Sequence, residues 1–319
     1  MTVGSLFSGI GGIDLAFQQA GFEIKWAIEK DEACCKTYRY NFPSGNLLES
    51  DIHNVNLASL SKVDVIVAGF PCQSFSVAGK QRGFSDPRGN AFFEIQRYIL
   101  WDEPRFVFLE NVPNLIDHDN GKTFNVIHNV FSELGYVIRY RVLRSSLYGG
   151  VPQIRDRIYM VAFREQEDCD CFSFPDQIDM KFTIEDVLKR NTKKHNIYYY
   201  GADDPFYHYA KRFVKRNDSI YRVYHDSIKI TQNHMCPTLT ASMGIRDNQV
   251  HLVLDDFGIR KLTVRECLAF QGFPKDFRFP QTITIFDAYK QIGNSVCVPV
   301  IKRIADHIIL FFEKGLKNG

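Results

Sequence analysis

The chain has 319 residues, with 39 lysines and arginines against 37 aspartates and glutamates, so its net charge is only +2. This balance neither requires nor excludes a nucleic-acid partner, because local charge matters more than the total. No run approaches the roughly 20 apolar residues that span a bilayer, and the first residues lack the features of a signal peptide. We therefore expect a cytoplasmic protein with one large domain and a smaller one.

The eight cysteines contain no C-x-x-C pair, and no histidine cluster accompanies them. This spacing favours neither a zinc site nor a disulfide framework, so we expect no metal. Most of the cysteines are interpreted as small apolar packing residues, which leaves room for one nucleophile.

Residues 1–165 alternate short apolar runs with amphipathic stretches. The runs predict strands at 3–8, 25–28, 63–68, 105–109 and 157–163, and the helical spacing predicts helices at 13–19 and 124–134. Strands that alternate with helices indicate an α/β fold, Rossmann-like, with a mostly parallel sheet covered on both faces. The amphipathic segment 299–312 predicts a final helix that packs back on this sheet.

The pattern becomes irregular from Glu165 to about Asp256. Between residues 189 and 229, ten lysines and arginines against four aspartates give a local charge of +6, and nine aromatic residues lie among them. Such a stretch suits a surface that contacts phosphates, and it suits equally a solvated face over a small core. We predict a smaller domain at 166–255, and a main domain formed by 1–165 plus 256–319.

A glycine-rich turn at 7–12 lies between the first strand and the first helix. Such a turn lets the backbone approach a ligand closely at the N-terminus of a helix. Glu29 ends the second strand, where an acid commonly binds ribose hydroxyls, and Asp51 follows a third element just before Ile52. A nucleotide-type cofactor site and a tight turn without a ligand both fit this pattern.

Two candidate catalytic groups follow neighbouring strands. Cys72 lies directly after the strand at 63–68, and Glu110 with Asn111 follows the strand at 105–109. The carboxyl ends of parallel strands meet at one edge of a sheet, so we expect Cys72 and Glu110 to face the same crevice. The segment 73–88, rich in serine, glycine and basic residues, predicts a loop that closes over a substrate. Taken singly, Cys72 is also compatible with an inert buried thiol and Glu110 with a helix cap.

Two further motifs precede the last strand and the last helix of the predicted fold. Strand alternation places Arg155 and Arg157 on one face, where two guanidinium groups suit a phosphate or a carboxylate, or form a surface ion-pair ladder. The run Gly293-Asn294-Ser295 predicts a turn and a helix N-cap.

Together these motifs resemble, in order and over nearly the whole chain, the DNA (cytosine-5)-methyltransferases, particularly those of bacterial type II restriction–modification systems. The resemblance implies an enzyme with the fold of S-adenosyl-L-methionine-dependent methyltransferases, which binds this cofactor and releases S-adenosyl-L-homocysteine. It also implies a target-recognition domain at 166–255. It implies that Cys72 attacks carbon 6 of a flipped-out cytosine, that Glu110 grips the base, and that Asn111 orients Glu110. Arg155 and Arg157 are implied as the arginine pair beside the active site, and Arg265-Glu266 as support for the recognition region.

The resemblance also assigns binding residues. Those implied for the cofactor are Phe7, Ser8, Gly9, Ile10, Gly11, Gly12, Glu29, Lys30, Asp51, Ile52, Gly69, Pro71, Asn294 and Ser295. Those implied for DNA are Gln73, Ser76, Lys80, Arg82, Thr238 and Leu239. Two positions depart from the family pattern: Ser5 stands where many members carry aspartate, and Lys30 stands where an aromatic residue often stacks on adenine.

The partner implied is double-stranded DNA, and family analogy adds a paired restriction endonuclease and a monomeric state. Three alternatives stay open at this point. They are a tRNA cytosine-5 methyltransferase on the same motifs, a catalytically silent DNA-binding relative, and a nucleotide-binding dehydrogenase. The dehydrogenase does not account for the Pro-Cys-Gln and Glu-Asn-Val motifs.

Overall fold

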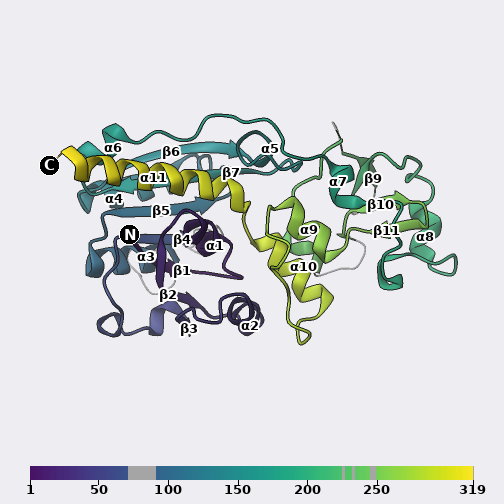
Figure 1. The fold of residues 1–319 in the computed structure, drawn as a ribbon, viewed down its shortest axis with the longest axis horizontal. Helices are drawn as coiled ribbons and strands as arrows, with labels where there is room; N and C mark the ends of the chain where they lie inside the picture. The colour runs from purple at the N-terminus through teal and green to yellow at the C-terminus, as the bar shows by residue number, and fades with distance from the viewer. Residues whose placement is uncertain (71–90, 225–226, 232–233, 245–248, 319) are drawn as a thin grey trace. The chain divides into compact units, whose positions relative to one another are not determined.

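A computed structural model describes residues 1–70, 91–224, 227–231, 234–244 and 249–318, with side chains described up to residue 310. Its contacts divide the chain into two compact units (Figure 1). Unit 1 comprises Met1–Leu143, Asp156–Asp176 and Val300–Gly319, and unit 2 comprises Arg144–Arg155 and Gln177–Pro299.

These bounds differ from the predicted domain boundaries. Residues 256–299 were expected in the main domain, but they group with unit 2. The physical reason is local packing: α10 (Ile285–Asn294) packs on α9 (Val264–Phe270) and on the short helix Ala241–Gly244. The assignment of target recognition to residues 166–255 stays a prediction.

Unit 1 is built on a seven-stranded sheet in the order β3-β2-β1-β4-β5-β7-β6. The pairs β1–β2, β2–β3, β1–β4 and β4–β5 are parallel, whereas β7 runs antiparallel to β5. The strands are β1 (Thr2–Leu6), β2 (Glu23–Glu29), β3 (Leu47–Glu49), β4 (Val65–Gly69), β5 (Phe106–Asn111), β6 (Val137–Arg144) and β7 (Asp156–Phe163). The prediction of a mostly parallel α/β sheet is confirmed.

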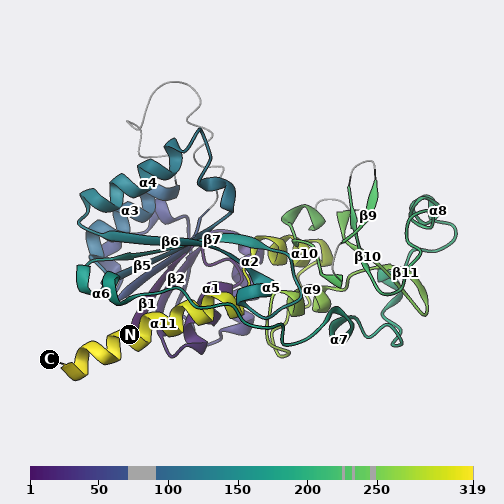
Figure 2. The same cartoon turned by 90° about the horizontal axis from the view of Figure 1, so that it is seen from above.

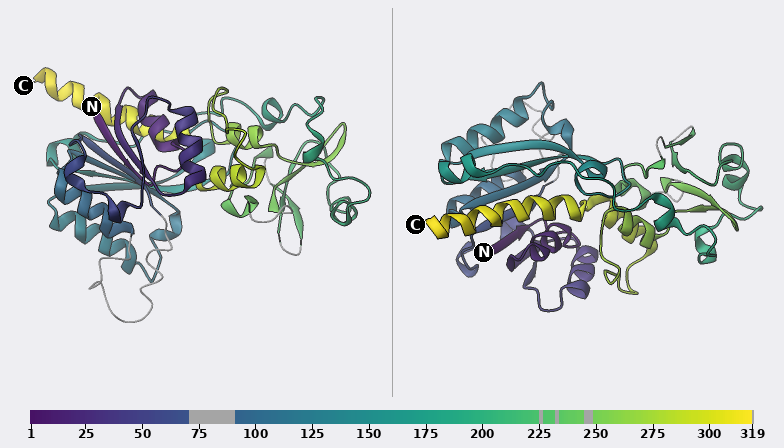
Figure 3. Two further views of the ribbon diagram at one scale, coloured as in Figure 1. Left: turned by 90° about the horizontal axis from the view of Figure 1, so that it is seen from below. Right: turned by 45° about the horizontal axis from the view of Figure 1, so that its top comes forward.

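Helices cover both faces of this sheet. Figures 2 and 3 show α3 and α4 on one face and α1 and α11 on the other. The helices of this unit are α1 (Gly12–Gln19), α2 (Glu32–Asn41), α3 (Ala91–Asp102), α4 (Lys122–Glu133), α6 (Gln166–Cys171) and α11 (Val298–Asn318). Both faces are apolar because β5 alternates: Val107 and Leu109 join the core under α3 and α4. Phe108 faces the other way and meets Phe17 of α1, with ring centroids 5.3 Å apart.

The final helix packs on unit 1. Its buried side chains include Val300, Ile304 and Ile308. Arg303 donates to the Asp176 carbonyl at 2.9 Å, and a ring nitrogen of His307 lies 2.8 Å from the Ser173 carbonyl oxygen. Strand β6, by contrast, escaped prediction, because most of its side chains are exposed and no continuous apolar run marks it.

Unit 2 contains a four-stranded antiparallel sheet in the order β11-β10-β8-β9. Its strands are β8 (Ile220–Val223), β9 (Ile228–Ile230), β10 (Leu252–Asp255) and β11 (Gly258–Lys261). Its helices include α5 (Ser145–Tyr148), α7 (Ile184–Leu188), α8 (Pro205–Ala210), α9 and α10. The sequence pattern did not reveal this sheet. Strands of three or four residues are too short to impose a recognisable period on the sequence.

Candidate active site

The strand that leads to Cys72 ends beside Glu110. Gly69 at the end of β4 is the register partner of Glu110 on β5, and a Cβ placed on Gly69 would lie 3.7 Å from Glu110 Oε2. The chain then continues through Phe70, whose carbonyl accepts a 2.9 Å hydrogen bond from Asn111 Nδ2. Pro71 and Cys72 lie outside the described residues. The described backbone therefore ends at Phe70, two residues before Cys72. There it is hydrogen-bonded to β5, the strand that carries Glu110.

Asn111 does not orient Glu110 as we expected. Its Nδ2 donates to the Phe70 carbonyl, and its Oδ1 accepts from the Val112 backbone at 2.8 Å. Asn111 is buried, and a buried amide is stabilised by using both its donor and its acceptor. Its side chain fixes the segment before Cys72 rather than the carboxylate.

Glu110 forms an ion pair with Arg157. Arg157 Nε lies 3.1 Å from Glu110 Oε1, and the two side chains are only 13% and 11% exposed. Strand β7 places the arginine there, because it pairs antiparallel with β5 and matches Tyr159 with Glu110. Arg157 also donates to the Asp156 carbonyl at 2.7 Å. An arginine so placed offers charge-assisted donors at the edge of the sheet where the carboxylate lies.

The predicted cofactor turn is tightly built. Phe7, Gly9 and Gly11 all have positive φ, at 55°, 55° and 83°. Ser8 bonds back to the Ile28 carbonyl through its backbone N–H at 3.1 Å and its hydroxyl at 3.2 Å. Nothing lies within 4 Å of a Cβ placed on Gly9, so the backbone there faces open space. Gly12 begins α1, while Ile10 is buried in the core.

The two predicted cofactor acids are held differently. The Glu29 carboxylate accepts backbone N–H groups from Gly9, Lys30 and Asp31, each at 2.8 Å. Glu29 therefore fixes the glycine turn and keeps part of its acceptor capacity.

Asp51 forms an ion pair with Lys30, the residue that directly follows β2. Lys30 Nζ is 3.0 Å from Asp51 Oδ2, and His53 Nδ1 is 2.5 Å from Asp51 Oδ1. The hydrogen bonds from His53, together with Lys30, hold the pKa of Asp51 at about 2, so it is ionised near neutral pH. Ile52 is buried, and its carbonyl accepts from Arg97 and Tyr98, so its side chain is a core residue.

A buried acid lies behind the glycine turn, and the sequence patterns did not single it out. Asp14 of α1 accepts hydrogen bonds from the Ser5 hydroxyl at 2.5 Å and the Tyr38 hydroxyl at 2.7 Å. Its exposure is 0%, and burial raises its pKa to about 6. Ser5, the departure from the family pattern, thus has a defined partner. The spacing of apolar residues could not have revealed this partnership. It marks the inward face of α1, where Asp14 lies, but not the polar groups that a residue on that face meets.

Asp14 is expected to make the stability of the protein fall as pH rises from about 4 to 6. In that window the unfolded carboxyl, with a pKa near 3.8, has lost its proton while the folded one keeps it. The free energy of unfolding should therefore fall by about 2 kcal/mol across this range, and Asp14→Asn should abolish that contribution. Urea unfolding of both proteins at several pH values measures the difference. The exposed Asp117→Asn variant is the control, and an unchanged pH profile in Asp14→Asn would contradict the assignment.

Within unit 2, Arg155 is buried among backbone carbonyls. It is 2% exposed and donates to the Leu239 carbonyl at 2.8 Å and to the Ser295 carbonyl. The hydrogen bonds of Arg155 thus go to backbone carbonyls, whereas Arg157 pairs with Glu110, and a common anion for the two arginines stays a prediction. Strand β7 begins at Asp156, so strand alternation does not extend to Arg155.

The Thr238-Leu239 pair also differs from expectation. Leu239 is fully buried, so its side chain is a packing residue rather than a DNA contact. Thr238 is half-buried, and its hydroxyl donates to the Ile154 carbonyl at 2.6 Å. The predicted DNA contacts Gln73, Ser76, Lys80 and Arg82 lie outside the described residues.

The run at 293–295 ends a helix instead of forming a free turn and N-cap. Gly293 and Asn294 belong to the last turn of α10, and Ser295 is its C-cap. Asn294 is exposed and Ser295 is buried. Gly293 is required by close packing, since a Cβ there would lie 2.1 Å from the Thr240 carbonyl carbon.

Gly293→Ala is expected to destabilise the protein by about 3 kcal/mol or more, because the obstructing atoms are backbone and cannot move aside. Gly135→Ala is the matched control. Gly135 has a φ of 79° but open space around it, so that variant should cost only the backbone strain of about 1 kcal/mol. Urea unfolding compares the two. Equal costs would show that the contact with Thr240 is unimportant.

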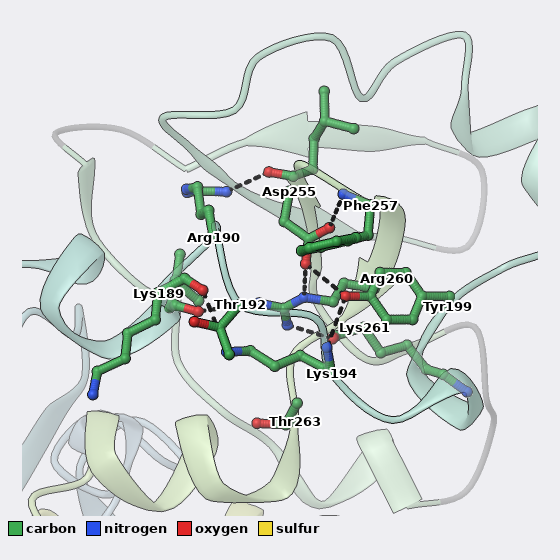
Figure 4. A network of polar contacts seen from close by, with 12 residues as sticks. Lys189, Arg190, Thr192, Lys194, Tyr199, Asp255, Phe257, Arg260, Lys261 and Thr263 are labelled. Carbon is green, nitrogen blue, oxygen red and sulfur yellow. Dashed lines mark hydrogen bonds and ion pairs between the residues drawn. The ribbon is translucent and has the colours of Figure 1, made fainter.

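A second buried arginine organises the antiparallel sheet of unit 2 (Figure 4). Arg260 on β11 is 0% exposed and pairs with Asp255 at 2.6 Å and with Glu266 of α9 at 2.8 Å. Tyr199 donates to the same Asp255 at 2.9 Å. Glu266 also closes a capping box with Thr263 at the start of α9. These contacts give the Arg265-Glu266 motif a structural role, which joins α9 to the sheet.

Comparisons with solved structures define the class of fold. The structure matches a DNMT2 variant from Spodoptera frugiperda with a TM-score of 0.76 and 21% identity, over 97% of this chain and 99% of that one. It matches the methyltransferase EhMeth of Entamoeba histolytica with a TM-score of 0.75 and 19% identity, over 98% of each chain. The fold is that of a methyltransferase.

Sequence comparisons identify the family. The family described as C-5 cytosine-specific DNA methylase matches residues 1–310. The Type II methyltransferase M.Bsp6I of a Bacillus species is 44% identical over 311 residues, which cover 97% of this chain and 98% of that relative. M.HhaI of Haemophilus parahaemolyticus is 33% identical over 316 residues, which cover 95% and 92%. The chain therefore belongs to the C-5 cytosine-specific DNA methylases and is a DNA cytosine-5-methyltransferase of the type II restriction–modification kind. Within the described part of the chain, no helix has the length and apolarity needed to cross a membrane.

Proposed function

We propose that this enzyme transfers a methyl group from S-adenosyl-L-methionine to carbon 5 of a cytosine flipped out of a short, specific sequence in double-stranded DNA. The observation that best supports this proposal is the Glu110–Arg157 pair, 3.1 Å apart, next to the strand end that leads to Cys72. The carboxyl group and the guanidinium lie at the sheet edge where the described chain toward Cys72 ends, and cytosine methylation needs these groups together with a thiol.

The chemistry begins with activation of the ring. Carbon 5 of cytosine is a weak nucleophile, and addition of the Cys72 thiolate to carbon 6 converts the ring to an enamine. Glu110, when protonated, donates to ring nitrogen N3 and so offsets the negative charge that builds on the base. Arg157 holds the Glu110 carboxyl group in place and adds positive charge beside it. After methyl transfer, loss of the carbon 5 proton and elimination of Cys72 release the product.

The residues around the glycine turn fit the cofactor. The open space over Gly9 admits a ligand close to the backbone, and the fixed Glu29 carboxylate can accept ribose hydroxyls. Asp51, ionised near neutral pH, can accept a hydrogen bond from an adenine amino group. When bound, the cofactor supplies the electrophilic methyl group. Gly69, Pro71, Asn294 and Ser295 stay predicted cofactor contacts, and S-adenosyl-L-homocysteine is the predicted product.

The target base must leave the duplex, because carbon 6 is not accessible inside the stack, and flipping costs a few kcal/mol. DNA binding would use the basic and aromatic side chains of unit 2. There Arg222 lies over the ring of Tyr224 at 5.0 Å, and Lys229 lies 5.6 Å from the same ring centre. Cations held on aromatic rings near a strand pair suit contacts with phosphates.

Bisulfite sequencing of DNA from cells that express the protein tests the reaction and identifies its site. We expect 5-methylcytosine at one position of a short recurring sequence. Incubation of the purified protein with labelled cofactor and either plasmid DNA or tRNA distinguishes the substrates. Label in tRNA alone would contradict the proposal. A role in protecting the host follows if methylated DNA resists an endonuclease that cuts the same sequence.

A further inference from the structure

The guanidinium of Arg155 joins two segments that are far apart in the sequence. One nitrogen donates to the Leu239 carbonyl at 2.8 Å, across 84 residues, and the other donates to the Ser295 carbonyl, across 140 residues. The Gly293 carbonyl lies 3.5 Å from the same nitrogen. A buried guanidinium is costly unless its charge is compensated by hydrogen bonds, and here backbone carbonyls supply them.

The chain around Leu239 is held by further bonds to the segment just before Arg155. The Ile154 N–H donates to the Cys236 carbonyl at 2.8 Å, and the Thr238 hydroxyl donates to the Ile154 carbonyl at 2.6 Å. The Cys236 N–H donates to the Pro152 carbonyl at 2.7 Å. Residues 236–239 therefore lie alongside the segment that leads to Arg155. An isolated parallel β-bridge between Gln153 and Cys236 belongs to the same contact.

The same segment is pressed against α10 on its other side. The backbone of Thr240 and Ala241 packs so closely on Gly293 that no side chain fits between them. Arg155 spans this contact, because it holds the carbonyl before Thr240 and the carbonyls at the end of α10. The segment 236–241 belongs to the long connection between β9 and β10. Its position therefore affects how the antiparallel sheet is anchored in unit 2.

Arg157 has a different set of contacts. It pairs with Glu110 inside unit 1, whereas Arg155 donates to backbone carbonyls inside unit 2. Two arginines separated by one residue thus bind different parts of the protein.

We infer that Arg155 is a positioning residue for DNA recognition, which fixes the segment 236–241 against the end of α10. This inference rests on the proposed function. Loss of the clamp loosens the connection that carries the predicted DNA contact Thr238. Affinity and selectivity for DNA should then fall, and the rate of methyl transfer on bound DNA should not.

The test compares Arg155→Lys with Arg157→Lys on a duplex with the sequence identified by bisulfite mapping and on a duplex with one base pair changed. A lysine keeps the charge but cannot bond several carbonyls in a fork. We expect Arg155→Lys to raise KM for DNA and to lower discrimination between the duplexes, each by about 10-fold, the effect of one lost charge-assisted hydrogen bond. Its kcat should fall by less than about threefold, whereas Arg157→Lys should lower kcat instead.

Arg105→Lys is the control, since Arg105 of unit 1 also donates two hydrogen bonds in a fork, both to Asp168 at 2.7 Å. It should lower the unfolding midpoint without changing discrimination. If Arg155→Lys does not fold, Thr238→Val removes one bond of the same segment and should lower discrimination by about threefold. The inference is overturned if Arg155→Lys lowers kcat alone, or if Arg105→Lys loses discrimination to the same degree. A wild-type protein without methyl transfer to DNA would instead overturn the proposed function.

Discussion

Glu110→Gln is expected to lower the rate of methyl transfer by about 10²–10³-fold, the usual cost of one group that stabilises transition-state charge. Glutamine keeps the shape of the side chain, but it cannot carry the proton that N3 requires. It also leaves the Arg157 guanidinium without its ionic partner at 3.1 Å. Single-turnover transfer of labelled methyl groups to a saturating duplex isolates this step from binding.

Glu94→Gln provides the control for this variant. Glu94 of α3 is also a buried carboxylate paired with an arginine, since Arg97 Nε lies 2.7 Å away, but it lies on a helix rather than at a strand end. Its removal should change the single-turnover rate by less than about twofold, because it contacts no proposed reacting group. Transfer by Glu110→Gln at the wild-type rate would remove Glu110 from the mechanism.

Cys72→Ser is expected to lower methyl transfer further, by roughly 10⁴-fold or more, because a nucleophile and its assisting groups act as one unit. A serine hydroxyl is not ionised near neutral pH, whereas a thiol with a pKa near 8.5 supplies some thiolate. A duplex with 5-fluorocytosine at the target position offers a second measurement. Fluorine cannot leave as a proton does, so the wild-type protein should remain covalently bound to this DNA, and Cys72→Ser should not.

The exposed Cys171 provides a matched substitution, and Cys171→Ser should retain both transfer and trapping. Covalent trapping of Cys72→Ser on the fluorinated duplex would show that another residue attacks carbon 6. Wild-type transfer rates in Cys72→Ser would exclude the covalent mechanism altogether.

The sequence predicted the central strands of unit 1 well because they are buried on both faces. The run at 63–68 and the run at 105–109 are almost continuously apolar, and they correspond to β4 and β5. Because parallel strands end together, this order predicted Cys72 and Glu110 at one edge, and in the structure Gly69, three residues before Cys72, pairs with Glu110. The antiparallel sheet of unit 2 escaped prediction, because its short strands carry no such run.

Side-chain partners across long separations were beyond sequence patterns. Nothing near Arg155 indicates that it binds carbonyls 84 and 140 residues away. The amide of Asn111 is similar, because its partner Phe70 directly follows the neighbouring strand β4, 41 residues earlier. The resemblance to a family marked Arg155 and Asn111 as motif residues. Their contacts in the structure are needed to distinguish a residue that positions the chain from one that takes part in the reaction.

The pairing of Gly69 with Glu110 also limits how this protein can change in evolution. The distance between the acid and the chain that leads to Cys72 is set by the hydrogen bonds of adjacent strands, not by the helices that cover them. Substitutions or insertions in α3 or α4 can therefore accumulate while the reacting groups keep their spacing. One residue inserted inside β5 before Glu110 would turn that carboxyl group to the opposite face of the sheet. Length variation among active descendants of this chain should thus be confined to segments outside β4 and β5.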